Sequence, residues 1–411
     1  MNKKKIVFLM SFGHCGIDWL HSLLDSHPQI LIMPSFSFYR TWKLLNLDSV
    51  QSVNEMHNCW INHFNSKKMQ GIDTKQFYSS NEIEIFSKKL LFFLKKNGID
   101  RKNTLLSIMD SYAAAKKIEY NDLKVFVEHE HVSYPYKEIF RDFEKPNILM
   151  IYRDPRASIA GYYKGIDKKY GKWPDIYEYF IDMSLEEWLN SYDLYKMYKN
   201  ELDSKFKLVK NEELSSNTQI EMKKISKWLG IDYSNILTKS TYPSGLDWRI
   251  DSSYISKDKI FNKQNDDFFE PKEVKKRWME VLKDKRDIIM IEFLLDKFFK
   301  EFGYKRITKN NIYIKLKGLL YFLIPHRGPK RFSYYFVNEN ELERFKNRLV
   351  LSRKVIIFYL FRYLPYFIQS NLFFIRSVIK NFLIIFFPGD RWKRYDNYFL
   401  EESYRINQQI K

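Results

Sequence analysis

Cysteine is scarce in this chain. The 411 residues include two cysteines, Cys15 and Cys59, and neither stands at the spacing of a zinc-binding or redox motif. A disulfide scaffold and a structural zinc site both need more cysteine than this. The sequence therefore predicts neither a disulfide framework nor a metal site, and it favours a reducing compartment.

Long uninterrupted apolar runs are also missing. A membrane-spanning helix needs about 20 consecutive apolar residues, but Arg362, Pro365, Arg376 and Lys380 interrupt the apolar stretches near the C-terminal end. The apolar run at the N-terminal end is too short for a signal peptide, and no small-residue cleavage site follows it. We therefore expect that run to be a first strand and the protein to be cytoplasmic.

The Gly-Lys-Ser/Thr ending of the nucleoside-triphosphate loop is absent as well. This part of the chain instead has an apolar run (Ile6–Met10), a loop with two glycines (Ser11–Gly16) and a helical pattern that starts at Asp18. The run predicts a strand buried on both faces, and Asp18 is expected to cap the helix. A strand, a glycine-bearing loop and a helix start bring backbone N–H groups together, which favours a bound phosphate. A purely structural turn is the alternative.

Strand and helix patterns alternate through the first 305 residues. Further strands are expected at Ile30–Met33, Lys124–Val127, Asn147–Tyr152 and Phe206–Val209. Helices are expected between and after them, at Asn54–Phe64, Glu82–Lys96, Asn103–Lys117, Tyr136–Phe143, Leu185–Met197, Ile220–Leu229, Pro271–Leu282 and Arg286–Phe302. This alternation predicts an α/β fold, a parallel sheet flanked by helices.

Three segments that could carry chemistry follow predicted strands. They are Ser11–Gly16, His129–His131 and Arg153, and ligands of parallel sheets bind at the carboxyl ends of the strands. We therefore expect one site along this edge. Arg153 could fork onto a phosphate there or pair with a carboxylate, and the following Asp154-Pro155 is expected to start a helix.

His129 and His131 are expected on one side of an extended segment, with Glu128 and Glu130 on the other, because strand side chains alternate. A histidine near neutral pKa is suited to taking a proton from a hydroxyl group. Two partly buried histidines that bind the backbone are the alternative. As metal ligands the pair is incomplete, because no third ligand stands nearby in the sequence.

Three stretches together resemble the sulfotransferases that use 3′-phosphoadenosine-5′-phosphosulfate (PAPS). They are HCGIDWLHSLLDSHPQI, YRDPRAS and VKNEELSSN…ISKWLGI, and the resemblance runs from about residue 4 to residue 305. VKNEEL is similar to the Tyr-Glu-x-Leu strand end of that family, with Asn211 in the aromatic position. The resemblance implies the family's P-loop-like fold.

The resemblance also implies roles for individual residues. The 5′-phosphosulfate would lie on the first loop and helix start, formed by Gly13, His14, Cys15, Gly16, Ile17, Asp18 and Trp19. Arg153 would hold the 3′-phosphate; Gly161 stands where the family has a serine, and Ser158 is the substitute hydroxyl. Trp248 and Arg249, in TYPSGLDWRIDSS, would close over the donor.

Three histidines are the implied catalytic residues. His131 is the expected base, because cytosolic members carry a base histidine at a similar offset before the arginine, and His129 or a neighbouring glutamate is the second candidate. His14 stands where members have Lys or Arg, and it would stabilise the bridging oxygen as sulfonate leaves. The resemblance implies transfer of a sulfonate to a hydroxyl group. We expect no metal, because the loop lacks the Mg²⁺-binding hydroxyl of the nucleoside-triphosphate loop, and we expect a glycan or glycolipid as the acceptor. The alternative is a non-catalytic relative that binds a nucleotide or a partner.

The basic charge is concentrated in the last hundred residues. The chain carries a net charge of +19, and residues 312–411 hold 18 Lys and Arg against 7 Asp and Glu. No nucleic-acid-binding motif accompanies this charge, and we expect no nucleic-acid partner. The basic residues are mixed with apolar helical patterns at Ile312–Ile324, Arg353–Ile368 and Asn371–Phe387.

Such helices are typical of segments that lie in an anionic membrane interface. We therefore expect a sulfotransferase-like domain at 1–305 and a helical extension at 306–411, with residues 312–387 on the inner face of the cell membrane. A helical cap packed on the catalytic domain is the alternative. The bias toward Lys, Asn, Ile, Phe and Tyr is typical of an AT-rich bacterial genome.

Overall fold

The computed structural model of the chain describes most of its first 324 residues. The described ranges are 4–25, 27–33, 36–67, 77, 79–130, 135–161, 174–240 and 278–324, together with ten residues between 371 and 386. Two compact units contain them. The core unit comprises Met1–Arg153 and Asp193–Lys272, and the second unit comprises Asp154–Tyr192 and Glu273–Lys411. The predicted division into 1–305 and 306–411 stays a prediction.

Within the described residues of the core unit, five strands form one sheet in the order β2-β3-β1-β4-β5. All neighbouring strands are parallel, so the predicted α/β fold with a parallel sheet is confirmed. The strands are β1 (Lys5–Ser11), β2 (Ile30–Ile32), β3 (Val125–His129), β4 (Asn147–Tyr152) and β5 (Phe206–Lys210).

The apolar runs predicted the strands well because parallel strands are buried on both faces. β4 has the predicted bounds. β3 continues two residues beyond its predicted end, because Glu128 and His129 pair with Phe8 and Leu9 of β1. His129 is therefore the last residue of β3.

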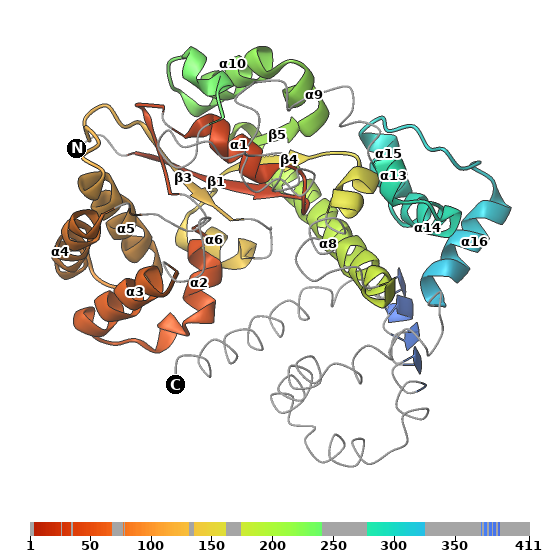
Figure 1. The fold of residues 1–411 in the computed structure, drawn as a ribbon, viewed down its shortest axis with the longest axis horizontal. Helices are drawn as coiled ribbons and strands as arrows, with labels where there is room; N and C mark the ends of the chain where they lie inside the picture. The colour runs from red at the N-terminus through yellow and green to blue at the C-terminus, as the bar shows by residue number, and fades with distance from the viewer. Residues whose placement is uncertain are drawn as a thin grey trace. The chain divides into compact units, whose positions relative to one another are not determined.

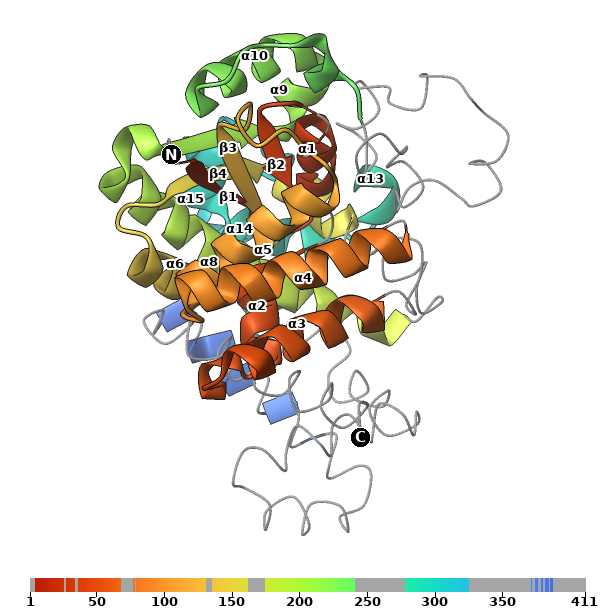
Figure 2. The same cartoon turned by 90° about the vertical axis from the view of Figure 1, so that its left-hand side faces the viewer.

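The two faces of the sheet bury different side chains. Phe8, Met10 and Phe12 alternate along β1 and contact aromatic rings, among them Tyr39 and Tyr195. Figures 1 and 2 show α9 (Asn211–Ser216) and α10 (Thr218–Leu229) on one side of the sheet, and α3, α4 and α5 on the other. The other helices of the core unit are α1 (Ile17–Leu24), α2 (Phe38–Leu44) and α6 (Tyr136–Asp142).

Helices α3 (Val53–Lys67), α4 (Ser80–Asn97) and α5 (Arg101–Ala115) lie side by side, as Figure 2 shows. Their ends follow local signals. Ser79 and Glu82 form a capping box at the start of α4, and Gly98 ends that helix with a positive φ of 93°, as the Asn97-Gly98 pair predicts.

The described part of the second unit is helical. Its elements are part of α8 (Pro174–Glu201), α13 (Trp278–Val281), α14 (Lys285–Leu294), α15 (Asp296–Glu301) and α16 (Ile312–Leu323). The helix predicted at Arg286–Phe302 is instead α14 and α15, because the backbone leaves the helical conformation at Leu295.

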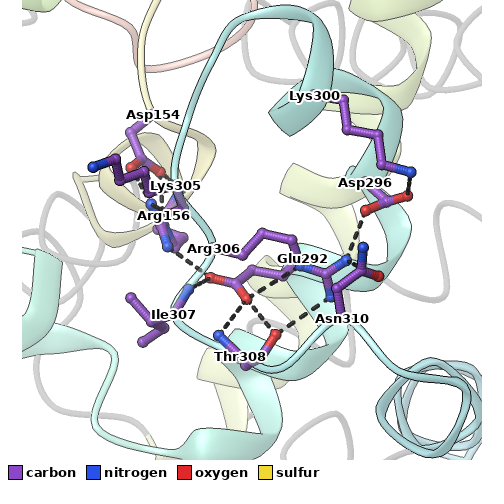
Figure 3. A network of polar contacts seen from close by, with 10 residues as sticks. All are labelled: Asp154, Arg156, Glu292, Asp296, Lys300, Lys305, Arg306, Ile307, Thr308 and Asn310. Carbon is purple, nitrogen blue, oxygen red and sulfur yellow. Dashed lines mark hydrogen bonds and ion pairs between the residues drawn. The ribbon is translucent and has the colours of Figure 1, made fainter.

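A buried polar network joins parts of the second unit that are distant in sequence (Figure 3). The Arg156 guanidinium pairs with Asp154 and Glu292, each at 2.6 Å. Glu292 also accepts hydrogen bonds from the backbone N–H groups of Ile307 and Thr308. The segment that precedes α16 is thereby fixed to the helix that follows β4.

Two further observations bear on the predictions. None of the helices in the described ranges combines the length and the apolar character that crossing a bilayer requires. The same ranges hold no group of three or more His, Cys, Asp or Glu side chains placed to hold a metal ion.

Candidate active site

The glycine loop and Arg153 follow neighbouring strands at the same edge of the sheet. Ser11 is in register with Ile151, and the Phe12 N–H donates to the Ile151 carbonyl at 3.2 Å. The next residues, Gly13 and Arg153, therefore lie at adjacent strand ends, and neighbouring strands are about 4.8 Å apart.

β1 and β4 also form a topological switch point. After β1 the chain continues to β2, on one side of the sheet, and after β4 it continues to β5, on the other. The connections leave in opposite directions, and open α/β sheets bind ligands in the crevice that this creates. The predicted grouping of the loop with Arg153 thus has a topological basis.

The loop after β1 has an unusual backbone. Gly13, His14 and Gly16 have φ angles of 90°, 45° and 86°, in the region that disfavours side chains. The Gly13 N–H donates to Ser11 Oγ at 3.1 Å, and the Cys15 thiol donates to the Gly13 carbonyl at 3.0 Å. The turn is therefore held from inside, with Cys15 buried and the His14 ring exposed. A non-glycine residue at positive φ marks a position where function is worth testing.

Helix α1 starts one residue earlier than predicted. Its N-cap is Gly16, which makes no side-chain capping bond, and Asp18 lies in the first turn. The prediction that Asp18 caps α1 is therefore wrong, because the left-handed Gly16 ends the loop and Ile17 already belongs to the helix. The Ile17 and Trp19 side chains are buried, so these two residues offer only backbone N–H groups to a ligand.

Asn211 lies against Gly16 of the loop. It is the first residue of α9, directly after β5, and it is buried. A Cβ atom on Gly16 would lie 2.3 Å from Asn211 Nδ2, so a side chain at position 16 would displace the amide. Asn211 was not predicted as a site residue; the signal for it is its place at the strand end that resembles the family's motif.

His129 is the last residue of β3 and lies against α1. Its Nδ1 is 2.8 Å from Nδ1 of His21, and its Nε2 is 3.8 Å from Asp18 Oδ1. Both histidines are buried, whereas Asp18 is exposed. One of the two facing Nδ1 atoms must carry the hydrogen, and a proton on Nε2 of His129 would be stabilised by the Asp18 carboxylate.

His21 was not predicted as a site residue. The only local signal for it is the three-residue spacing from Asp18, which places both side chains on one face of α1.

Glu128 and Glu130 point to the other face of the sheet, as the strand alternation predicts. Glu128 Oε1 accepts a hydrogen bond from the Phe38 N–H, and Glu130 Oε1 accepts one from the Tyr39 N–H, both at 2.6 Å. Burial raises the pKa of Glu130 to about 8, although the Tyr39 N–H and the nearby Arg40 act in the opposite direction. The two glutamates hold the start of α2, on the face opposite His21.

The two arginines of the RDPRA motif differ in environment. Arg153 is half-buried at the end of β4. In the second unit, Asp154 Oδ1 accepts from the Arg156 N–H at 2.9 Å, and the helix starts at Pro155, so the predicted cap is confirmed. Arg156 pairs with two carboxylates, those of Asp154 and Glu292, and the role of Arg153 stays a prediction.

The remaining predicted residues lie elsewhere in the chain. In the second unit, Ser158 is buried and its Oγ accepts from the Trp188 indole N–H at 2.9 Å, and Gly161 is a buried helical residue. His131, Trp248 and Arg249 lie outside the described residues.

Comparison with known proteins identifies the family. The model of the sulfotransferase domain family matches residues 4–301. No curated protein matches the chain. Among solved structures, it is similar to the sulfotransferase domain from the Synechococcus PCC 7002 olefin synthase, with 13% identity, a TM-score of 0.41, and coverage of 74% of this chain and 98% of that chain.

A second similar structure is the sulfotransferase domain from the curacin biosynthetic pathway, with 13% identity and a TM-score of 0.36. That likeness covers 69% of this chain and 99% of the other. The carbohydrate-type subfamily stays a prediction. The match over residues 4–301 means that the chain belongs to the sulfotransferase domain family and is a sulfotransferase, an enzyme that transfers sulfonyl groups.

Proposed function

We propose that this enzyme transfers a sulfonate group from PAPS to a hydroxyl group of a glycan or glycolipid. The family generally uses PAPS as its donor. The observation that carries the proposal is the register of β1 and β4, which brings the Gly13–Gly16 loop and Arg153 to adjacent strand ends at the switch point. Backbone N–H groups of the loop and the side chain of Arg153 are the groups there that would bind anions.

The local geometry fits a donor with two anionic ends. The left-handed residues of the loop and the first-turn N–H groups of α1 suit a phosphosulfate, because they offer backbone donors and the positive end of the helix dipole. Gly16 lets the Asn211 amide approach the loop closely, since a side chain at position 16 would displace it. Arg153 would pair with the 3′-phosphate. The exposed His14 ring would stabilise charge on the bridging oxygen when it is protonated.

The acceptor hydroxyl needs a proton acceptor, and the 129–131 segment would provide it. As the acceptor oxygen forms its bond to sulfur, the bond from sulfur to the bridging oxygen breaks, and the hydroxyl proton passes to a histidine. His131 remains the proposed base, with His129 as the second candidate. His129 has support of its own, because Asp18 stabilises a protonated imidazole and His21 fixes the ring.

The choice of a glycan or glycolipid acceptor has a different basis. The basic and apolar residues at 312–387 would hold the enzyme at a membrane surface, where a lipid-linked acceptor would be close by.

Calorimetric titration with adenosine 3′,5′-bisphosphate tests the donor site. We expect one binding site, and Arg153→Ala should weaken Kd about 10- to 100-fold, the range of a charge-assisted hydrogen bond. Arg141→Ala, which removes an exposed arginine from α6 of the same unit, is the matched control and should leave Kd unchanged. An unchanged Kd in Arg153→Ala would contradict the assignment of the 3′-phosphate.

Transfer of radiolabelled sulfate from PAPS to a set of glycans and glycolipids tests the acceptor class. Donor binding with transfer only to acceptors of another class would refute that part of the proposal. Donor binding without transfer to any acceptor would favour the non-catalytic alternative.

A further inference from the structure

Helix α16 is held in place through one face. Gly318 and Phe322 are buried, and a Cβ atom on Gly318 would lie 2.4 Å from Cβ of Phe293 in α14. The glycine thus lets α16 approach α14 closely. The Arg286 guanidinium donates to the carbonyls of Tyr321 and Ile324 at the end of α16. The position and rotation of the helix are therefore fixed.

The opposite face of α16 is apolar and exposed. Ile312 has 72% of its surface accessible, Leu316 has 53% and Leu320 has 52%. These residues recur every four positions, so they form one stripe, and Ile324 and Tyr313 extend it. A helix that faces water normally carries polar residues on this side, so the stripe indicates contact with something other than water.

A second stripe belongs to the same unit. The described residues between 371 and 386 are helical, and Asn381 Nδ2 donates to the Phe322 carbonyl of α16 at 2.8 Å. Asn381 is buried, so its contact marks the side of this helical segment that faces the rest of the unit. The exposed apolar residues are Ile375, Ile379, Phe382, Leu383 and Phe386. We call the two stripes together the apolar face.

The segments that carry the two stripes contain basic residues and no acidic ones. The sequence has no Asp or Glu from residue 302 to 338 or from 344 to 389, whereas residues 305–324 contain five Lys and Arg. Lys317 lies at the stripe itself, with Nζ 4.5 Å from the centre of the Tyr313 ring. A second copy of this chain would bring like charges together, whereas an anionic bilayer offers both an apolar interior and negative headgroups.

We propose that the apolar face of the second unit docks on an anionic lipid bilayer. The helices lie in the interface, with the apolar stripes toward the acyl chains and the basic side chains toward the headgroups. The packing of α16 on α14 uses only the inner side of α16. The outer side can therefore contact a membrane while the inner side stays packed on α14. The anionic cytoplasmic leaflet is the surface that suits this chemistry. The proposal does not depend on the donor or the acceptor.

Vesicle flotation of the full chain tests the proposal. The vesicles contain phosphatidylcholine alone or with phosphatidylglycerol, and we expect binding to the second kind, weakened when salt is raised from about 0.1 M to about 0.5 M. Leu316→Glu/Leu320→Glu should lower partitioning about 100-fold, because two leucines leave the apolar phase. Ile220→Glu, at an equally exposed position on α10 (55% accessible), is the matched control and should bind like the wild type.

Folding and donor binding are measured on the same proteins. The exposed positions should leave the melting temperature and the Kd for adenosine bisphosphate unchanged, so that a loss of flotation reports the surface alone. Equal flotation of the double variant and the wild type would overturn the proposal. The proposal would also be overturned if, without vesicles, the wild type were a dimer and the double variant a monomer. The apolar face would then be an interface between copies of the chain.

Discussion

Glu130→Gln is expected to stabilise the protein at neutral and alkaline pH. Glu130 directly follows β3 and is completely buried, and this burial raises its pKa from the ordinary value of 4.5 to about 8. The folded protein therefore keeps a proton on this carboxyl group that the unfolded chain releases above pH 4.5. The stabilisation from this proton is complete below the unfolded pKa and is lost as pH rises through the folded pKa.

The size of the effect follows from the two pKa values. Stability falls by about 1.4 kcal/mol per pH unit between them, so the loss at pH 7 is about 3 kcal/mol. Glutamine is neutral and keeps an oxygen that accepts the Tyr39 N–H, as the protonated Glu130 does. We expect Glu130→Gln to exceed the wild type by up to about 3 kcal/mol at pH 7 and to match it near pH 4.5.

Urea unfolding followed by circular dichroism at several pH values from 4.5 to 8.5 measures this difference. Glu144→Gln, at an exposed position of the same unit, is the control and should follow the wild type. The reasoning fails if Glu130→Gln is less stable than the wild type at pH 8, or if the two stability curves run parallel. Either result would mean that the folded protein carries Glu130 as a carboxylate.

Two further predictions concern the candidate site. Gly16→Ala should lower the free energy of unfolding by about 1–2 kcal/mol, because position 16 has a positive φ. It should also weaken bisphosphate binding, because the added methyl group would displace Asn211. The double variant Gly16→Ala/Asn211→Ala should recover part of the stability loss. Strictly additive melting data would contradict the close approach of the two residues. His21→Leu should lower kcat about 10-fold or more with an unchanged Kd for bisphosphate, and His21→Asn, which keeps a polar atom near His129, should lower it less. Equal rates of the two His21 variants would remove the positioning role.

The sequence predicts the sheet because of how a parallel sheet is built. The inner strands are buried on both faces, so they are visible as apolar runs such as Asn147–Tyr152, whatever their neighbours are. The common edge follows from the direction of the strands alone. The end of β3 is less visible, because Glu128 and His129 are polar and belong to the strand only through their pairing with β1.

The cap of α1 shows where local patterns fail. Aspartate is favoured both at the N-cap and in the first turn of a helix, so Asp18 alone does not distinguish the two positions. The structure decides through Gly16, which has a left-handed backbone and lies against Asn211. That contact depends on β5 lying beside β4, and no local pattern near residue 16 contains this information.

The pairing of His21 with His129 has the same origin. The two residues are 108 positions apart, and they meet because β3 lies between β1 and β2, the two strands that α1 connects. In the sequence, His129 stands out through the alternation of side chains along its strand, whereas His21 is marked only by its helical spacing from Asp18. The pair therefore becomes visible only when strand order is known.

The RDPRA motif offers two guanidinium groups, and their environments decide which one a donor phosphate can engage. Arg156 lies between the rings of Trp278 and Phe299 and pairs with Asp154 and Glu292. Withdrawing it would take the nearest cation from the fully buried Glu292, whose other cation, Arg306, lies 3.7 Å away. Breaking a buried ion pair costs about 3–5 kcal/mol, which is as large as the gain from a new phosphate contact. Arg156 is therefore committed to the fold, and Arg153, at the strand end beside the glycine loop, stays the residue that we propose for the 3′-phosphate.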